Sequence, residues 1–150
     1  MVDTVLVYIE KNDQYLLIYR NKKKNDINEG KWIGVGGHIE KGETPIDAMI
    51  REVKEETNLD VLSYVKNGIV HFKNEDFSET MHLFTVTKFE GEIGNCDEGE
   101  LRFINKKDMN KLQMWEGDKI FLKYLEDKEP YFELVLEYKG EKLLSSKRIK

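Results

Sequence analysis

Three glutamates lie close together in a segment whose pattern is typical of a helix. Glu52, Glu55 and Glu56 stand at positions i, i+3 and i+4, which places their carboxylates on one side of a helical cylinder. Like charges at this spacing repel each other by roughly a few tenths of a kcal/mol unless a cation lies between them. A hard divalent cation prefers carboxylate oxygens and commonly bridges them to phosphates. The cluster therefore predicts either a metal site or an ordinary solvated acidic face.

The residues around this cluster favour the metal site. Five residues separate Gly37 from Glu43, seven separate Glu43 from the run Arg51-Glu52-Val53, and Leu59 ends the pattern. This arrangement resembles the signature of the Nudix hydrolases, in which a loop, a helix and a loop bind divalent metal and the phosphates of a nucleoside diphosphate derivative. Asn58 stands where the family usually has glycine, and asparagine tolerates a left-handed turn best among the other residues.

The resemblance assigns roles to individual residues. It implies that the carboxylate metal ligands are Glu52, Glu55 and Glu56, and that the backbone carbonyl of Gly36 joins them. Glu43 and Arg51 are then organising residues, because an ion pair of Arg51 with a carboxylate would hold the helix against its preceding loop. The alternative for Arg51 is a surface ion pair that contributes less than about 1 kcal/mol.

A glutamate is also expected to act as general base. A bound metal lowers the pKa of a water molecule, neutralises phosphate charge and aligns attack with a pyrophosphate leaving group. The base could be Glu55 or Glu56 in the helix, or a residue of the acidic loop 97–100. Members similar to MutT bring a glutamate of a comparable loop to the metal, which favours Glu100 as base and ligand, with Glu98 as the alternative. The loop could also be simply exposed to solvent.

A second group of residues could recognise the base of a nucleotide. Trp115 and Asp118 resemble a segment of Nudix enzymes that hydrolyse oxidised purine nucleoside triphosphates, where tryptophan stacks on the base and an acidic group contacts its edge. An indole can stack on a purine, and a carboxylate can pair with its N–H donors. Alternatively, Trp115 belongs to the core and Asp118 caps the helix that follows it.

Two further candidates lie near the glycines. Residues 31–37 resemble the first strand of the site in the oxidised-purine enzymes, but Ile33 stands where the mammalian-type enzyme has an asparagine that contacts the base. Selectivity for 8-oxoguanine would then depend on Trp115 and Asp118. His38 directly follows Gly37 and could donate a hydrogen bond to the substrate.

The predicted function is hydrolysis of a nucleoside triphosphate to a monophosphate and pyrophosphate, with an oxidised purine nucleotide such as 8-oxo-dGTP as the favoured substrate. Mg²⁺ is the expected cofactor, with Mn²⁺ as the alternative. Other open functions are pyrophosphohydrolysis of general nucleotides or RNA 5′ ends, and nucleotide binding by a non-catalytic sensor. ADP-ribose pyrophosphatases usually carry a proline after the signature, and residues 73–75 contain none.

The helix that carries the glutamates has clear end signals. Thr44 as N-cap, Pro45 at the first position and Asp47 in a capping box predict its start. It should end near residue 57, with Asn58 as a left-handed cap. A stripe of apolar residues on this helix is expected to face the core, namely Ile46, Met49, Ile50 and Val53.

The remaining pattern predicts an α+β fold with a mixed sheet and two main helices. Residues 4–10 and 14–20 indicate a β-hairpin, and residues 59–72 and 79–90 alternate like long antiparallel strands. Shorter strands are expected at residues 101–104 and 131–138, and a second helix at residues 118–125. The resemblance implies a Nudix α/β/α sandwich with a mixed central sheet and the catalytic loop-helix-loop.

Composition limits the remaining possibilities. The chain has 150 residues, 24 basic and 29 acidic, with a net charge of −5 and 39% hydrophobic residues. These values predict one globular domain over residues 1–150 and argue against a duplex-DNA binder. No apolar run approaches the roughly 20 residues that span a bilayer, and the single cysteine favours a cytoplasmic location. The oligomeric state is not predicted.

Overall fold

Strands are the most abundant elements of the structure, a computed structural model that describes residues 2–150. The strands are β1 (Val2–Lys11), β2 (Gln14–Tyr19), β3 (Trp32–Ile33), β4 (Val35–His38), β5 (Asp60–Asn74), β6 (Phe77–Glu90), β7 (Glu100–Asn105), β8 (Phe132–Lys139) and β9 (Lys142–Arg148). The helices are α1 (Pro45–Thr57), the short 3₁₀ helix η1 (Lys106–Lys111) and α2 (Glu116–Glu126).

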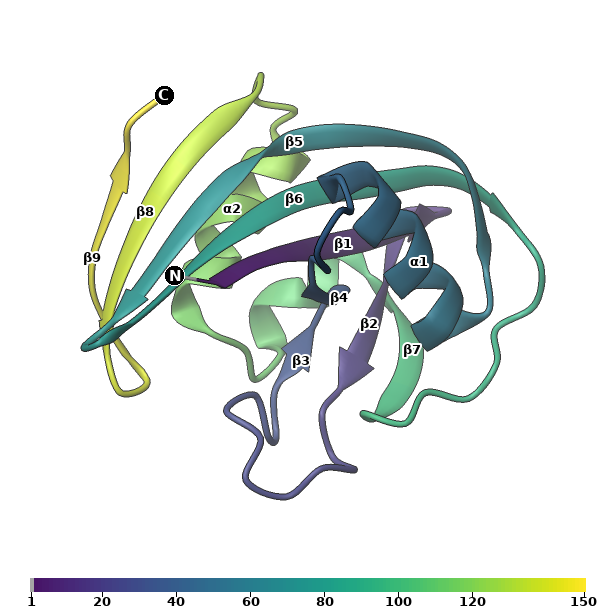
Figure 1. The fold of residues 1–150 in the computed structure, drawn as a ribbon, viewed down its shortest axis with the longest axis horizontal. Coiled ribbons are helices and arrows are strands. Elements are labelled where there is room, and N and C mark those ends of the chain that lie inside the picture. Colours follow the sequence, from purple (N-terminus) through teal and green to yellow (C-terminus); the bar gives the residue numbers. More distant parts are fainter. Residues whose placement is uncertain (1) are drawn as a thin grey trace.

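The strands join in one mixed sheet. Its main order within the described residues is β3-β2-β1-β6-β5-β8-β9, with β4 paired to β1 and β7 to β2. β1 runs parallel to β6 and β5 parallel to β8, whereas β5 and β6 are antiparallel. β5 and β6 are long, curved strands that extend across much of the molecule (Figure 1). The α+β prediction with a mixed sheet is confirmed.

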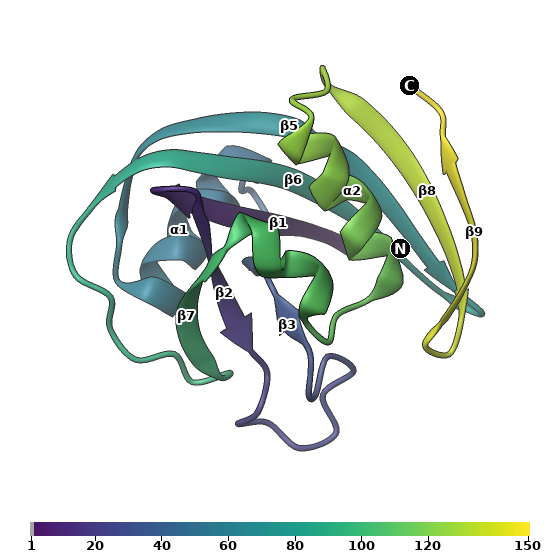
Figure 2. The ribbon, with the colours of Figure 1, turned by 180° about the vertical axis from the view of Figure 1, so that it is seen from behind.

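Helices α1 and α2 cover opposite faces of the sheet (Figures 1 and 2). Side chains of β1 alternate between two core layers: Val7 and Ile9 pack on the α1 side, whereas Leu6 and Tyr8 pack on the α2 side. A strand buried on both faces needs a continuous apolar run, which residues 5–9 supply. The result is the expected sandwich of helix, sheet and helix. No helix within residues 2–150 is long and apolar enough to cross a membrane.

The predicted ends of α1 are confirmed. The Thr44 hydroxyl accepts a hydrogen bond from the Asp47 N–H at 3.1 Å, and the Asp47 carboxylate accepts one from the Thr44 N–H at 3.3 Å. These two bonds form the capping box, and Pro45 takes the first helical position. At the other end, Asn58 has a φ of 67° and a ψ of 10°, which is the left-handed conformation that the sequence predicts.

The apolar face of α1 differs from the prediction. Met49 and Val53 are buried, but Ile46 and Ile50 are 38% and 43% exposed, so the prediction for these two residues is wrong. The buried face is centred on Met49, Val53 and Glu56, and at about 100° per residue Ile46 and Ile50 lie at its flank. An acidic side chain therefore occupies part of the inner face of α1.

Most other predicted elements are confirmed with shifts of a few residues, while η1 and β9 were not predicted. Residues 31–37, which resemble a single strand in the sequence, form parts of two short strands, β3 and β4. β3 and β4 are short and lie among glycines, and β9 is mostly exposed, so neither segment has an alternating apolar pattern. The N-cap of α2 is Trp115, and Asp118 lies within the first turn. The alternative that Asp118 caps this helix is therefore wrong.

Candidate active site

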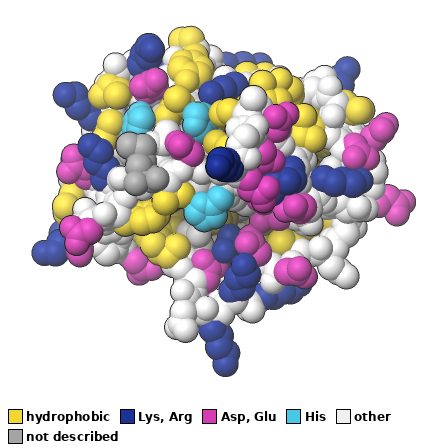
Figure 3. Space-filling model, viewed as in Figure 1, with side chains coloured by type: hydrophobic (Ala, Val, Ile, Leu, Met, Phe, Trp, Pro, Cys, Tyr) yellow, Lys and Arg dark blue, Asp and Glu magenta, His cyan; other side chains and the backbone are white. Residues whose placement is uncertain are grey.

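Helix α1 places its three glutamates in different environments. Glu55 is exposed, Glu52 is largely buried and Glu56 is buried. Acidic side chains gather over α1 on this face of the molecule (Figure 3). Glu52 also lies against β4, where a Cβ atom added at Gly37 would stand 2.6 Å from Glu52 Oε1. A side chain at position 37 would therefore displace the Glu52 carboxylate.

Arg51 connects the loop before α1 with the carboxylates of the helix. Its Nε and Nη2 donate to the two carboxylate oxygens of Glu43, at 2.7 and 2.9 Å. Its Nη1 donates to Glu52 at 2.9 Å and to Glu55 at 3.2 Å. The hydrogen bonds from Arg51 lower the pKa of Glu43 to about 2. Both residues are thus in position for the organising role that the sequence predicts.

Two carboxyl groups lie against each other beneath this network. Glu56 Oε2 accepts a hydrogen bond from the Gly36 N–H at 2.8 Å, and Glu98, from the segment before β7, contacts the same carboxyl group. Burial, followed by the contact with Glu98, raises the pKa of Glu56 to about 10. Two carboxyl groups can lie this close only when a proton or another positive charge offsets their repulsion.

The structure brings Glu98 rather than Glu100 to this site. Glu98 Oε2 is buried without a hydrogen bond and lies 3.2 Å from Arg20 Nη1. The carboxylate of Glu100 instead pairs with Arg102. Leu101, the next residue in β7, packs on the α1 side of the sheet, so Glu100 points to the opposite face because side chains alternate along a strand. Glu98 therefore takes the place predicted for Glu100.

The acidic cluster fits a hard divalent cation. Glu52, Glu56 and Glu98 influence one another electrostatically, and Glu98 contributes a buried oxygen without a hydrogen bond. No three such side chains within residues 2–150 meet at ligand distance, and Arg51 engages Glu52 and Glu55. A set of carboxylate oxygens is what Mg²⁺ and Mn²⁺ prefer. The donor chemistry thus agrees with the metal prediction.

A cavity of about 350 Å³ extends from the acidic cluster toward α2. This volume is in the range of small-molecule sites. Its lining includes Gly36, Gly37 and Glu98 from the acidic end. It also includes all four residues predicted to bind substrate, which are Ile33, His38, Trp115 and Asp118. The cavity joins two groups of residues that lie far apart in the sequence.

Trp115 and Asp118 are buried at the α2 end of this cavity. Trp115 Nε1 donates to Asn28 Oδ1 at 2.7 Å, and the indole is both part of the core and part of the lining. Burial, and to a smaller extent the charge of Glu79, raises the pKa of Asp118 to about 8. Asp118 is therefore mostly neutral at pH 7, and a neutral carboxyl group can both donate and accept hydrogen bonds.

Several lining residues were not identified from the sequence. Asn28 and Glu79 line the cavity, as does Thr4, whose hydroxyl donates to Glu79 Oε2 at 2.7 Å. Thr4 and Glu79 are 75 positions apart and meet because β1 and β6 pair in parallel. No local pattern in the sequence indicates that pairing. The hydrogen bond from Trp115 to Asn28 likewise joins distant segments.

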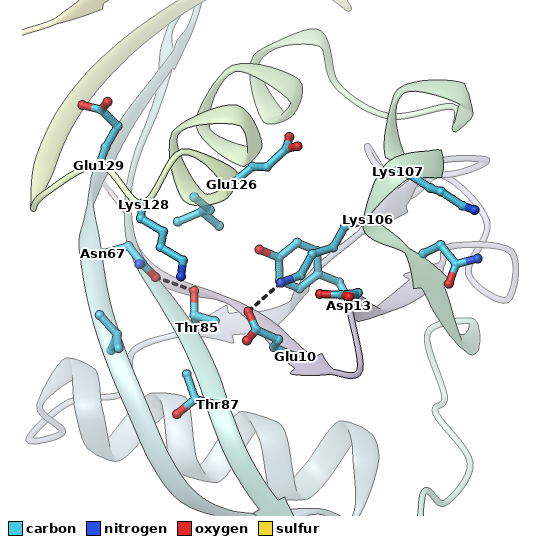
Figure 4. A pocket seen from close by; sticks show the side chains of 14 residues that line it. Glu10, Asp13, Asn67, Thr85, Thr87, Lys106, Lys107, Glu126, Lys128 and Glu129 are labelled. Atoms are coloured by element: carbon cyan, nitrogen blue, oxygen red, sulfur yellow. Dashed lines mark hydrogen bonds and ion pairs between the residues drawn. The ribbon is translucent and has the colours of Figure 1, made fainter.

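A larger cavity of about 980 Å³ lies at the opposite end of α2 (Figure 4). Lys106 donates to Glu10 at 2.9 Å across it, and Thr85 donates to Asn67 at 2.7 Å. Its lysines are matched by glutamates, and Glu98 of the acidic cluster lines the smaller cavity but not this one. Its charges thus give no net attraction for phosphate, and the acidic cluster rather than cavity size locates the candidate active site.

Comparison with known proteins identifies the class to which this fold and site belong. Residues 2–125 match the family model described as NUDIX domain. The chain therefore belongs to the Nudix family. It is a Nudix hydrolase, an enzyme of the class that acts on phosphoric anhydride bonds.

Individual relatives carry more specific names. A Danio rerio protein named oxidized purine nucleoside triphosphate hydrolase is 35% identical over 98 residues, which is 64% of this chain and 63% of that protein. The match thus spans less than two thirds of the zebrafish protein. An ADP-ribose pyrophosphatase of Methanocaldococcus jannaschii is 31% identical over 122 residues, covering 78% of this chain and 69% of that protein. The crystal structure of a MutT protein from Bacillus halodurans has a TM-score of 0.90 and 25% identity, covering 99% of this chain and 98% of that one.

Proposed function

We propose that this chain is a divalent-metal-dependent nucleoside triphosphate pyrophosphohydrolase that acts on purine nucleotides and favours an oxidised purine such as 8-oxo-dGTP. It releases the nucleoside monophosphate and pyrophosphate. The proposal depends chiefly on one observation, which is that Glu98 of the acidic cluster lines the same cavity as Trp115 and Asp118. A nucleotide in this cavity would have its phosphates at the acidic end and its base at the α2 end.

The acidic end handles the phosphates. Glu52, Glu56 and Glu98, with Gly36 beside them, are the groups that would hold Mg²⁺ or Mn²⁺, and Glu55 is a more exposed additional ligand or base. When bound, the cation neutralises phosphate oxygens and lowers the pKa of a water molecule. Arg51 orients the helix carboxylates through its contacts. His38 lies on the cavity wall, where its side chain is available to donate a hydrogen bond to a phosphate.

The α2 end recognises the base. Trp115 offers an aromatic surface, and Ile33 adds an apolar contact on the same cavity wall. Asp118, neutral because burial raises its pKa, can donate its O–H to one ring atom and accept from a neighbouring N–H. A base whose edge lacks the matching acceptor or donor leaves the carboxyl group without a hydrogen bond and therefore binds more weakly.

The relatives support this assignment and also one competitor. The name of the zebrafish relative refers to oxidised purine nucleoside triphosphates, whereas that of the archaeal relative refers to ADP-ribose. Both substrates contain a phosphoric anhydride and a purine, so the same acidic cluster serves either. They differ in the group attached beyond the second phosphate, which is a third phosphate in one and a second ribose in the other.

A substrate panel tests the proposal. Release of pyrophosphate and orthophosphate with Mg²⁺ is measured for 8-oxo-dGTP, dGTP, dCTP, ATP, ADP-ribose and 5′-triphosphorylated RNA. We expect pyrophosphate as product and a kcat/KM for 8-oxo-dGTP at least tenfold above that for dGTP. Mutation of the residues behind metal ligands typically costs about 10–100-fold in activity, so loss of a ligand in Glu56→Gln should reduce turnover by at least about a hundredfold, while Glu126→Gln on α2 should not. A higher kcat/KM for ADP-ribose than for any triphosphate would overturn the assignment.

A further inference from the structure

A lysine is buried behind the wall of the base pocket. Lys31 is only 5% exposed, and its Nζ stands 4.7 Å from the centre of the Trp115 ring. Lys31 does not line the cavity, whereas Trp115 does. The ammonium group therefore contacts the indole without being part of the cavity lining. A cation over an aromatic face is attracted to the ring and fixes its orientation.

The partner of Lys31 comes from the far end of the chain. Its ammonium group forms an ion pair with Glu141, in the turn between β8 and β9. Asn74 fixes this turn to the neighbouring β5–β6 turn, because its amide donates to the Gly140 carbonyl at 2.9 Å and its Oδ1 accepts from the Gly140 N–H at 3.1 Å. The tips of the two hairpins lie side by side in both ribbon views (Figures 1 and 2). Glu141 is thus presented to Lys31 from an anchored position.

The rings around Trp115 show that this wall is built from several segments. Phe72 and Tyr138 contact the indole edge to face, with centroid distances of 5.6 and 5.1 Å. Tyr138 and Glu141 lie beyond residue 125, where the match to the family model ends. The C-terminal hairpin therefore contributes to a wall whose other parts belong to the family region.

We propose that Glu141 is a positioning residue for purine recognition, which holds the Lys31 ammonium group over the ring of Trp115. The inference depends on the proposed function, in which the base stacks on this indole. An ammonium group without its partner carries an unpaired charge near apolar surface and turns toward water. Trp115 then loses one of the contacts that hold its ring, the others being the hydrogen bond to Asn28 and the two edge-to-face ring contacts, and stacking on the base weakens.

The test separates base binding from chemistry. Glu141→Gln removes the charge of a side chain that is 73% exposed, so we expect a melting temperature close to that of the wild type. The KM for 8-oxo-dGTP and dGTP should rise three- to tenfold with kcat within twofold, and the KM for dCTP should change less than twofold. As a matched control, Glu129→Gln breaks the ion pair with Arg148 in the same C-terminal region and should leave all constants unchanged.

A double variant tests whether Glu141 acts through Lys31. Lys31→Met should raise the KM for purine substrates at least as much as Glu141→Gln, and the double variant should equal Lys31→Met alone. The inference is overturned, and the proposed function is not, if the KM increases of the two single variants multiply in the double variant. The same holds if the KM of Glu141→Gln is unchanged while the wild type prefers purines. A wild type that does not distinguish purine from pyrimidine triphosphates overturns the proposed base pocket, and the inference with it.

Discussion

Two acidic side chains of similar chemistry meet different surroundings in this molecule. Glu56 is buried against Glu98 and accepts a hydrogen bond from Gly36, whereas Asp118 is buried beside Trp115 and influenced mainly by the loss of water around it. Burial is the main cause of the raised pKa in both, but the neighbouring groups differ. Glu56 has a like charge as neighbour, and a cation can replace its proton. Asp118 has none so close, which makes it a neutral hydrogen-bonding group.

The neutral state of Asp118 predicts a pH dependence of stability. Its pKa in the folded protein is about 8, above the ordinary value of 3.8, so the folded protein binds this proton more tightly than the unfolded chain does. The stability that the proton contributes is fully present below about pH 3.8 and is lost as the pH rises toward 8, by about 1.4 kcal/mol per pH unit. Asp118→Asn stays neutral and should not show this loss.

Thermal melting between pH 5 and pH 9 checks the effect. We expect the melting temperature of Asp118→Asn, relative to the wild type, to increase up to about pH 8 and then to level off. Asp127→Asn, at the other end of α2 and half-exposed, serves as the control and should show a constant difference. A constant difference for Asp118→Asn as well would mean that Asp118 is ionised in the folded protein.

Helix α1 depends on its two ends to direct the carboxylates. The capping box fixes the first turn, and Asn58 lets the chain leave the helix toward β5. The amide of Asn58 also donates to the carbonyl of Glu92 at 3.2 Å, which ties the end of the helix to the loop that leads to Glu98. The C-terminal cap therefore helps to position both the carboxylates of α1 and Glu98.

Substitutions at Asn58 should separate backbone conformation from the side-chain bond. Asn58→Ala is strained at a φ of 67° and should reduce the free energy of unfolding by about 1 kcal/mol or more. Asn58→Gly relieves the strain but loses the bond to Glu92, so its stability should stay within about 0.5 kcal/mol of the wild type. Urea unfolding of the three proteins measures both values. Equal losses in the two variants would show that the hydrogen bond, not the conformation, matters.

Elements with local signals were predictable, and contacts that depend on strand order were not. The caps of α1 and the turn at residues 11–13 follow from residue types within a few positions. The choice between Glu98 and Glu100 depends on where β7 begins and which face each residue takes, and neighbours in a strand point to opposite faces. The contacts of Glu79 and Glu141 require the order of the sheet, which no local pattern contains. The inward position of Glu56 was missed because a carboxylate on a core face contradicts the usual apolar pattern.

The chain beyond the family match is part of the same sheet. β8 pairs in parallel with the long strand β5, and β9 pairs with β8. Four side chains of β8 are buried beside α2, namely Phe132, Leu134, Leu136 and Tyr138. Since burial of one such side chain contributes roughly 1.5–3 kcal/mol, this strand contributes an amount comparable with the roughly 5–15 kcal/mol stability of a typical domain. We propose on this basis that residues 1–150 fold as one domain.

Two truncations test this proposal. A chain that ends at Glu141 loses only β9, whose side chains are mostly exposed, and should still melt cooperatively, at a lower temperature than the full chain. A chain that ends at Glu129 also loses β8 and leaves Val70 and Phe72 of β5 without their apolar neighbours, so we expect no cooperative transition. Circular dichroism during heating measures all three proteins. If β8 completes the core, the shorter chain cannot unfold in the same cooperative transition as the full chain. A cooperative transition of the shorter chain near the melting temperature of the full chain would therefore show that β8 and β9 are not part of the domain.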